Sequence, residues 1–292
     1  MSKRRSWLVA VAAVLVAGCA SSTTTTPPGG NTPTPEKGKP GAATPEGKPE
    51  GLFYRPGPAA GYRLERHDSL TLQYPGGAVQ QQVRDRIAFV HVTIGGTAGA
   101  TSYPLTIVLD SLQALENGQP VDSAIVARGT RWTGSLGLDG ELSQLQADRS
   151  GSLPDELGGR LRLLFPRLPA TEVREGLEWT DSSEYKLVAD AFPGKESQVT
   201  TYRVAEGSDS KNGVTLMSSG TYTRSGTRLQ ADQSLEMTAT GERHGEHRIG
   251  GDGAVISAQG SDHGDMTITV PAVGQTVPVK QAGSYSITST AH

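Results

Sequence analysis

The chain has 292 residues, and its 27 Lys and Arg stand against 30 Asp and Glu, for a formal net charge of −3 at pH 7. This mildly acidic balance argues against a nucleic-acid partner and against a basic membrane-docking surface. Gly is abundant at 37 residues and Cys occurs once, a composition typical of a β-rich protein with many turns and no disulfides.

The first 18 residues follow the pattern of a secretory signal peptide. Basic residues 3–5 precede an apolar run over residues 7–16, and Gly18 stands directly before Cys19. The run is well short of the ~20 apolar residues that a membrane-spanning helix needs. We therefore predict a signal peptide over residues 1–18, cleaved between Gly18 and Cys19.

The residues around this site, Leu15-Val16-Ala17-Gly18-Cys19, resemble the lipobox of bacterial lipoproteins. The resemblance implies that the Cys19 thiol is diacylated and that the new amino group is acylated, which gives a stable membrane anchor. Ala20, in place of Asp, resembles the Gram-negative pattern for the outer membrane, with the chain facing the periplasm; in other bacteria the anchor would lie on the extracytoplasmic face of the plasma membrane. Loss of residues 3–5 would leave 24 basic and 30 acidic residues.

Residues 19–51 predict a flexible linker behind the lipidated cysteine. The segment is rich in Thr, Pro and Gly, contains no aromatic residue, and interleaves Lys with Glu. It has too little apolar surface to offset the entropy of ordering. As a coil it would reach roughly 30 Å and hold the following domain off the membrane.

Residues 52–292 predict a β-rich globular domain. Apolar and polar residues alternate in several stretches, which favours strands with one polar face. The stretch 87–94 is almost wholly apolar and predicts a central strand. We expect a mainly β fold of antiparallel curved sheets, either a half-barrel or a two-sheet sandwich. The alternating stretches are 69–74, 185–190, 234–240 and 266–270.

Turn residues and one helical segment complete the expected architecture. Asp139-Gly140, Asn212-Gly213 and Asp252-Gly253 suit tight hairpins, and Asn117-Gly118 marks another turn. Leu157, Leu161 and Leu164 have helical spacing after Pro154, and Pro166 stops the pattern, so we predict one short mid-chain helix.

A weak internal repeat suggests a duplication. Residues 137–142 (GLDGEL) align with residues 250–255 (GGDGAV), and each contains an Asp-Gly turn at the same place. The halves would be residues 52–150 and 178–292, each giving one sheet of similar layout. Chance recurrence of Asp-Gly hairpins remains the alternative.

The sequence offers few signals for catalysis. It contains no nucleophile elbow, no phosphate loop and no dinucleotide fingerprint, so we expect no cofactor and a noncatalytic protein. Carboxylates and imidazoles near His244 and His263 allow a metal site as a weaker alternative. In a strand, however, His244 and His247 would point to opposite faces. Neither His67, whose neighbour Asp68 would face the other way, nor His91 is expected to act as an acid or base.

Trp132 and Trp179 are the candidate ligand-binding residues. Each lies in a strand-like setting, where aromatic side chains usually belong to the core or to cross-strand pairs, and where a minority line binding clefts.

A segment in the middle of the chain shows a second resemblance. The run Leu164-Phe165-Pro166-Arg167-Leu168-Pro169, followed by Val173, Gly176 and Trp179, resembles a phrase of uncharacterised β-rich bacterial lipoproteins. The fold that it implies is similar to the open half-barrels of the LolA/LolB type, in which a curved antiparallel sheet wraps a helical plug and holds acyl chains.

Three functions follow from these observations. The first is a lipid-anchored, noncatalytic binding module of the cell envelope, holding a lipid, another apolar ligand or a partner protein. The second is an envelope scaffold or assembly factor that docks on an envelope protein. The third is a metal-dependent hydrolase using His244 and His263.

Overall fold

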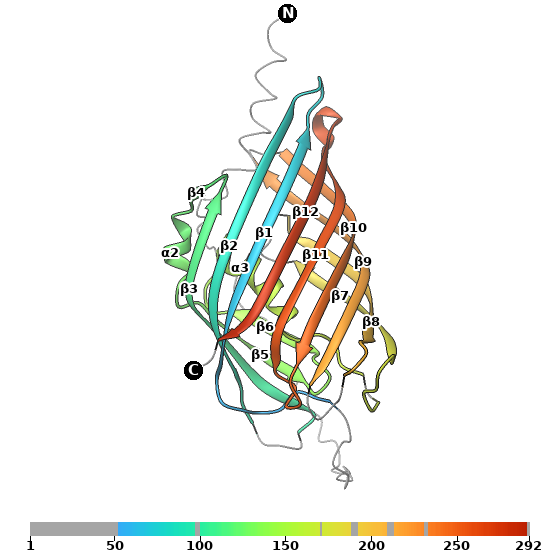
Figure 1. Ribbon diagram of the computed structural model, residues 1–292. Coiled ribbons are helices and arrows are strands. Elements are labelled where there is room, and N and C mark those ends of the chain that lie inside the picture. The colour runs from blue at the N-terminus through green and yellow to red at the C-terminus, as the bar shows by residue number, and fades with distance from the viewer. Residues whose placement is uncertain are drawn as a thin grey trace, which may run out of the picture. The chain divides into compact units, whose positions relative to one another are not determined.

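The computed structural model describes residues 52–96, 100–169, 171–187, 192–208, 213–230 and 233–290. From Glu50 onward the chain forms one compact unit. A single 12-stranded antiparallel sheet makes up most of it, curved and unclosed, with the order β6-β5-β3-β2-β1-β12-β11-β10-β9-β8-β7 and with β4 paired to β3 (Figure 1). The prediction of a mainly β, curved antiparallel fold is confirmed, in the half-barrel form rather than as a two-sheet sandwich.

The strands are long in the centre of the sheet and shorter at its edges. Their bounds are β1 Ala60–Gln73, β2 Val79–Ile94, β3 Ser102–Glu116, β4 Gln119–Pro120, β5 Arg131–Gly137, β6 Leu142–Ala147, β7 Glu178–Leu187, β8 Gly194–Val204, β9 Val214–Gln230, β10 Gln233–Ile249, β11 Val255–Val270 and β12 Gln275–Thr290.

Both predicted halves contribute to this one sheet. β1 and β12, the first and last strands, pair along twelve residues from Gly61↔Thr290 to Leu72↔Val279. The free edges are therefore β6 and β7, which lie in the middle of the chain. Residues 87–94 form the C-terminal half of β2, which lies between β1 and β3, as predicted for a central strand.

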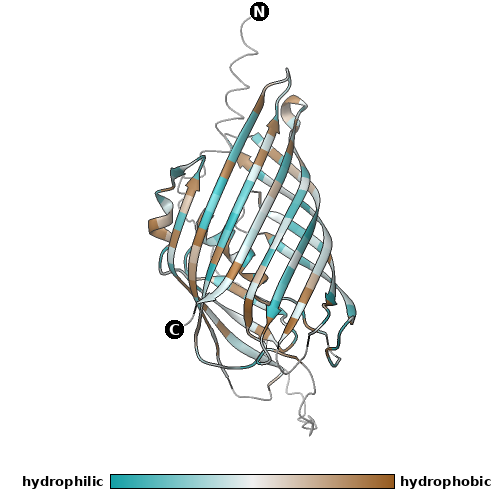
Figure 2. Cartoon of the chain, in the orientation of Figure 1, coloured by the Kyte–Doolittle hydropathy of each residue, from teal (hydrophilic) through white to brown (hydrophobic). Residues whose placement is uncertain are grey.

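Period-two alternation gives the sheet two different faces, and hydrophobic and hydrophilic residues alternate along its strands (Figure 2). We call the face that carries the predicted helix the inner face. There the helix packs into a core with Leu64, Val90, Ile107 and Ile287. The outer face carries mostly Ser, Thr, Gln and charged side chains.

The predicted mid-chain helix is confirmed as α3 (Ser152–Arg160), continued by the 3-10 turn η1 (Leu161–Leu164). Leu157, Leu161 and Leu164 are all buried, in line with their helical spacing. Gly158 leaves room for a neighbour in the core, because a Cβ at this position would lie 3.0 Å from Nε1 of Trp132. The glycine thus lets the helix approach the tryptophan closely.

A network of ion pairs connects this helix with the inner face. Asp68 on β1 accepts a 2.7 Å hydrogen bond from Nε of Arg66 and one of 3.0 Å from Arg160 on α3. Arg66 also pairs with Asp262 on β11 at 2.5 Å, and Arg160 with Glu156 at 3.1 Å. Burial alone would raise the pKa of Asp68, but Arg160 and Arg66 outweigh it, so the pKa is lowered.

Arg167 joins the two sides of the gap between the sheet edges. Its guanidinium lies 3.0 Å from Asp139 and 3.5 Å from Glu141 in the β5–β6 hairpin, and 3.3 Å from Asp181 on the edge strand β7. The backbone N–H of Leu168 also donates to the Asp139 carbonyl at 2.8 Å. The segment after η1 therefore bridges the free ends of the sheet.

The two Asp-Gly turns of the predicted repeat have the same geometry. Gly140 and Gly253 adopt φ of 86° and 85°, and each donates to the carbonyl three residues earlier, at 3.0 and 2.9 Å. Asp139 and Asp252 each accept from the N–H two residues later at 3.1 Å. The two turns thus share one geometry, and the two halves build one continuous sheet instead of one sheet each.

Two short helical elements were not predicted, α2 (Ser123–Ala127) and the 3-10 turn η2 (Pro271–Val273) between β11 and β12. In the single-turn helix α2, Ala124 and Ala127 are buried. Five residues are too few to show a helical period in the sequence. No helix within the described ranges has the length and apolar content needed to cross a bilayer.

Candidate functional site: a polar groove on the outer face

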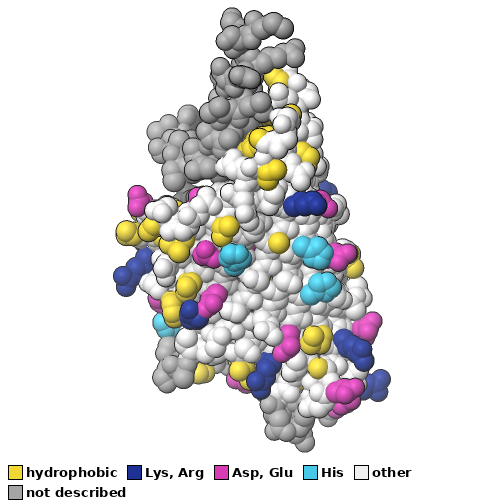
Figure 3. Space-filling model, turned by 45° about the horizontal axis from the view of Figure 1, so that its top comes forward, with side chains coloured by type: hydrophobic (Ala, Val, Ile, Leu, Met, Phe, Trp, Pro, Cys, Tyr) yellow, Lys and Arg dark blue, Asp and Glu magenta, His cyan; other side chains and the backbone are white. Residues whose placement is uncertain are grey.

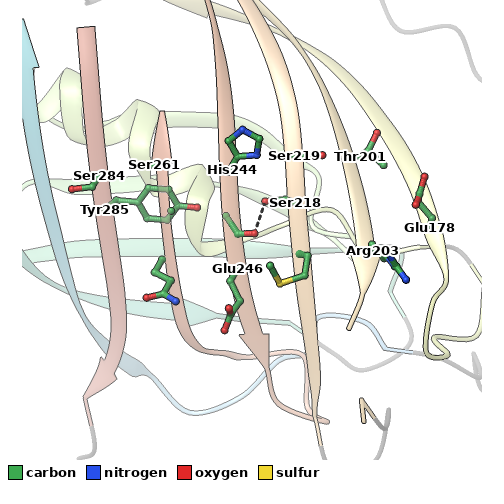
Figure 4. A pocket seen from close by; sticks show the side chains of 14 residues that line it. Glu178, Thr201, Arg203, Ser218, Ser219, His244, Glu246, Ser261, Ser284 and Tyr285 are labelled. Atoms are coloured by element: carbon green, nitrogen blue, oxygen red, sulfur yellow. Dashed lines mark hydrogen bonds between the residues drawn. The ribbon is translucent and has the colours of Figure 1, made fainter. Parts of the chain in front are cut away.

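A groove of about 730 Å³ crosses the outer face of the sheet from β12 to β7 (Figure 4). Six consecutive strands of the sheet line it, so its long direction runs across the strands. This volume falls within the range of about 300 to 1,000 Å³ that is typical of ligand pockets. The groove is the candidate functional site.

Strand register places one row of groove side chains directly opposite one another. His244 on β10 pairs with Ser219 on β9 and with Ser261 on β11. Ser219 in turn pairs with Thr201 on β8, and Ser261 with Ser284 on β12. We call this set the hydroxyl row: Thr201, Ser219, His244, Ser261 and Ser284. Adjacent strands are about 4.8 Å apart, so the row offers one hydrogen-bonding side chain at each such step.

A second row runs parallel to the first, two residues further along each strand. Arg203 pairs with Glu178 on β7 and with Met217 on β9. Glu246 pairs with Met217 and with Gln259. We call this set the charged row: Glu178, Arg203, Met217, Glu246 and Gln259. The thioether of Met217, whose residue is 45% exposed, is the apolar contact in this row.

The floor between the rows is made by small residues. Gly245 on β10 and Gly260 on β11 pair with each other and have no side chain on the inner face. The ring of Tyr285 on β12 fills the space that they leave, because a Cβ on Gly245 would lie 2.6 Å from its hydroxyl oxygen. Burial raises the pKa of Tyr285 to about 12, so the phenol stays neutral and packs as part of the floor.

The groove combines hydrogen-bond donors and acceptors without a dominant charge. Hydroxyl groups and the Gln259 carboxamide do both, Arg203 donates, and Glu178 and Glu246 accept. Figure 4 shows the hydroxyl row running from Ser284 to Thr201, with Glu246 and Arg203 of the charged row below it. Such a surface binds a polar ligand through many individually weak contacts.

The inner face offers much less space beside α3. A cavity there, between Leu64, Ala88, Leu157 and Ile287, has a volume of about 20 Å³. That is room for about one water molecule. The helix therefore fills the sheet interior around it, where an acyl chain would otherwise lie.

No protein-family model matches the chain, and no curated protein sequence does. Among solved structures, the chain is similar to DynF from the dynemicin biosynthesis pathway of Micromonospora chersina, at 11% sequence identity and a TM-score of 0.24. The match covers 86% of this chain and 92% of DynF. A likeness at this TM-score carries no argument about function.

The two tryptophans predicted to contact a ligand lie outside the groove. Trp132 is 2% exposed and belongs to the core against α3. Trp179, on the inner face of β7, stacks on Tyr202 with ring centroids 5.4 Å apart and planes at 17°. Its buried indole N–H has no hydrogen-bond partner among the described residues. Ligand contact by either tryptophan stays a prediction.

The histidines follow the alternation that the sequence predicted. His244 and His263 are on the outer face, while His247 is buried on the inner face at 4% exposure. The Nε2 atoms of His244 and His263 lie 3.9 and 3.6 Å from the same carboxylate oxygen of Glu242. Within the described part of the chain, no group of three or more His, Cys, Asp or Glu side chains is arranged to hold a metal ion.

The acid-base candidates are also separated as expected. Nδ1 of His67 lies 2.7 Å from Asp85 on the outer face, whereas Asp68 points inward to Arg66 and Arg160. His91 is paired with Asp110 on the outer face. The predicted cleavage and lipidation site, Gly18 and Cys19, lies outside the described residues.

Sequence reasoning found only His244 among the residues of the groove. Each of the others is a common side chain of a solvated strand, and no local motif links them. The signal that unites them is the pairing register across six strands, which is set by the whole sheet and cannot be read from short stretches of sequence.

Proposed function

We propose that the protein is a lipid-anchored, noncatalytic binding module of the cell envelope that holds an extended glycan strand in the outer groove. The observation that most directly supports this proposal is the hydroxyl row, which places five hydrogen-bonding side chains in register across β8 to β12. Their spacing of about 4.8 Å is close to the length of one pyranose ring with its glycosidic oxygen. A glycan lying across the strands would therefore meet one such side chain per sugar.

The composition of the groove supports a glycan over a protein partner. Centres of protein interfaces are enriched in aromatic residues and depleted of Ser and Glu. The groove contains Arg203 and Met217, which such centres also favour, but its rows hold three serines and two glutamates, and its one tyrosine is the partly buried Tyr285 of the floor. Sugar hydroxyl and acetamido groups both donate and accept, which suits Ser, Thr, Gln and Glu.

The volumes support a polar ligand over an apolar one. The groove holds about 730 Å³, against about 20 Å³ beside the inner helix. A lipid carrier would need the larger space on the apolar side. In this proposal the lipobox resemblance supplies the anchor at Cys19, and the predicted linker over residues 19–51 would let the domain reach a wall polymer.

Titration calorimetry with chitohexaose, a β-linked oligomer of N-acetylglucosamine, tests the proposal on the full chain in detergent. Ser219→Val with Ser261→Val removes two hydroxyl groups and keeps β-favouring side chains, while Thr288→Val on the outer face of β12 is the matched control. Two lost hydrogen bonds of about 1 kcal/mol each predict about 30-fold weaker binding for the double variant. The control should bind as tightly as the parent.

Equal binding by the double variant and the parent would contradict the proposal, as would the absence of any binding by the parent. Bound lipid detected in the purified protein by native mass spectrometry would instead favour the apolar-ligand alternative.

A further inference from the structure

Three hairpins of the sheet end at the same level and carry exposed apolar residues. The β1–β2, β9–β10 and β11–β12 hairpins expose Val79, Leu229 and Val273 at 65%, 80% and 48%. The register aligns them, since Leu72 near the end of β1 pairs with Val279 and Thr269 near the end of β11 pairs with Glu236 near the start of β10. We call Val79, Leu229 and Val273 the apolar tips.

The two adjacent hairpins β1–β2 and β11–β12 contain no charged residue near their tips. The sequence has none between Asp68 and Arg84, and none between Asp265 and Lys280. Five residues of strand on each side of each hairpin correspond to about 17 Å of sheet without charge. Figure 3 shows the same distribution: Lys, Arg, Asp and Glu are absent from the upper part of this face among the described residues.

The third hairpin differs, since Arg228 and Glu236 lie close to its tip and the sequence places Asp232 between β9 and β10. Leu229 thus adds apolar area at the rim of the charge-free zone.

We infer that the apolar tips dock into the surface of a phospholipid bilayer. Apolar side chains that enter the boundary between headgroups and acyl chains reach about 5 to 10 Å deep. For the β1–β2 and β11–β12 tips, a charge-free zone of about 17 Å exceeds this depth, so no ion of these two hairpins would have to leave water. Tyr74, at the base of the first tip and bonded through its hydroxyl to Gln80, suits the interface, where aromatic rings with a polar end gather.

The place where the chain enters the domain is compatible with docking on the membrane of the anchor. Tyr54 bonds through its N–H to the carbonyl of Leu138 at the opposite end of the strands from the tips. β12, with 16 residues, is about 50 Å long. Residues 19–51 could extend to about 110 Å, so they could run the length of the sheet. The docking does not depend on the glycan groove, which lies on a different part of the outer face.

The test uses the full lipidated chain in vesicles of phosphatidylethanolamine and phosphatidylglycerol at a ratio of about three to one, with a fluorophore at one introduced cysteine. Ala272→Cys places the probe beside Val273 in the β11–β12 turn, and Thr288→Cys at the far end of β12 is the matched control. The native Cys19 would not react if its thiol is acylated, so labelling of the parent would count against the anchor and not against the docking.

Quenching lipids with bromine on the acyl chains report contact with the bilayer. We expect at least fivefold stronger quenching of the probe at position 272 than at 288. In the same protein, Val79→Asp with Val273→Asp should abolish that difference. Both side chains are exposed, so these changes leave the core intact.

Equal quenching at 272 and 288, or strong quenching at 272 that survives the two Asp substitutions, would overturn the inference. A probe at 272 that is unquenched in vesicles, yet shielded from a water-soluble quencher in native membranes, would assign the tips to a protein partner and would also overturn it.

Discussion

Because His247 is buried, the stability of the protein should depend on pH by an amount that can be calculated from the structure. Its ring is 4% exposed on the inner face of β10, beside the backbone of Leu163. Burial lowers the pKa of His247 to about 4. An unfolded histidine has a pKa of about 6.5. Between these values the unfolded chain binds a proton that the folded protein does not, so stability falls as the pH falls.

The size of the effect follows from the two pKa values. The full difference of about 2.5 pKa units corresponds to about 3 kcal/mol, of which about 2 kcal/mol is lost between pH 7.5 and pH 5. His247→Leu and His247→Gln both remove the titrating group, although they differ in packing. Between pH 7.5 and pH 5, the free energy of unfolding of each variant should fall by about 2 kcal/mol less than that of the parent.

Urea unfolding followed by circular dichroism at pH 7.5, 6 and 5 measures these differences. Comparing the pH slopes of parent and variants removes the contribution of all groups that they share, including the remaining histidines. If both variants kept the slope of the parent, His247 would not be the buried neutral group that the structure describes, and the reasoning would fail.

Three further changes test the fold and the site. Asp68→Asn should lower the free energy of unfolding by about 3 kcal/mol at pH 7 in a urea titration, because Arg66 and Arg160 lose their shared carboxylate. The pKa of Asp68 is lowered in the folded state, so the difference in free energy of unfolding between parent and variant should be complete above about pH 4 and shrink in stronger acid. A difference that does not change with pH would count against the network. Gly245→Ala should lower the free energy of unfolding by about 1 to 3 kcal/mol, because the new Cβ crowds the Tyr285 hydroxyl. Adding Tyr285→Phe should restore part of this stability, and thermal melts that show no recovery would refute the packing. Zinc added to chelator-treated protein should leave Tm unchanged, because His244 and His263 share only Glu242, whereas a rise in Tm that His244→Ala and His263→Ala abolish would revive the metal hypothesis.

The sequence predicts the strands and the helix well because both produce a short-range periodicity of apolar residues. Leu157, Leu161 and Leu164 predicted α3 and η1, and the alternation around Leu70 predicted β1. Asp139-Gly140 and Asp252-Gly253 predicted two hairpins whose geometry proved equal. These features depend on neighbours within a few residues, so a single sequence contains them.

Long-range pairing could not be predicted in the same way. The pairing of β1 with β12 decides that the two halves share one sheet, and nothing local in either strand specifies it. The inner-face ion network did leave a signal, since Arg66 and Asp68 stand in phase with the apolar Leu64 and Leu70. Charged residues in an apolar phase indicate partners on the buried side, here Arg160 and Asp262.

The groove was beyond sequence reasoning for a related reason. Ser219 and Ser261 become neighbours only through His244, with which both pair. A shift of one strand by a single residue would turn its side chain to the inner face and interrupt the row. The candidate site is thus a property of the register and not of a motif.

The central claim, that a glycan strand lies along the hydroxyl row, is tested most directly by photocrosslinking in intact cells. A benzophenone amino acid in place of Ser261 would lie in the groove, and one in place of Thr93, exposed on β2, would lie outside it. The account predicts a high-mass adduct at position 261 only, which lysozyme digestion of the wall glycan collapses. An adduct at 261 that resists lysozyme and disappears with protease would contradict the account and identify the ligand as a protein.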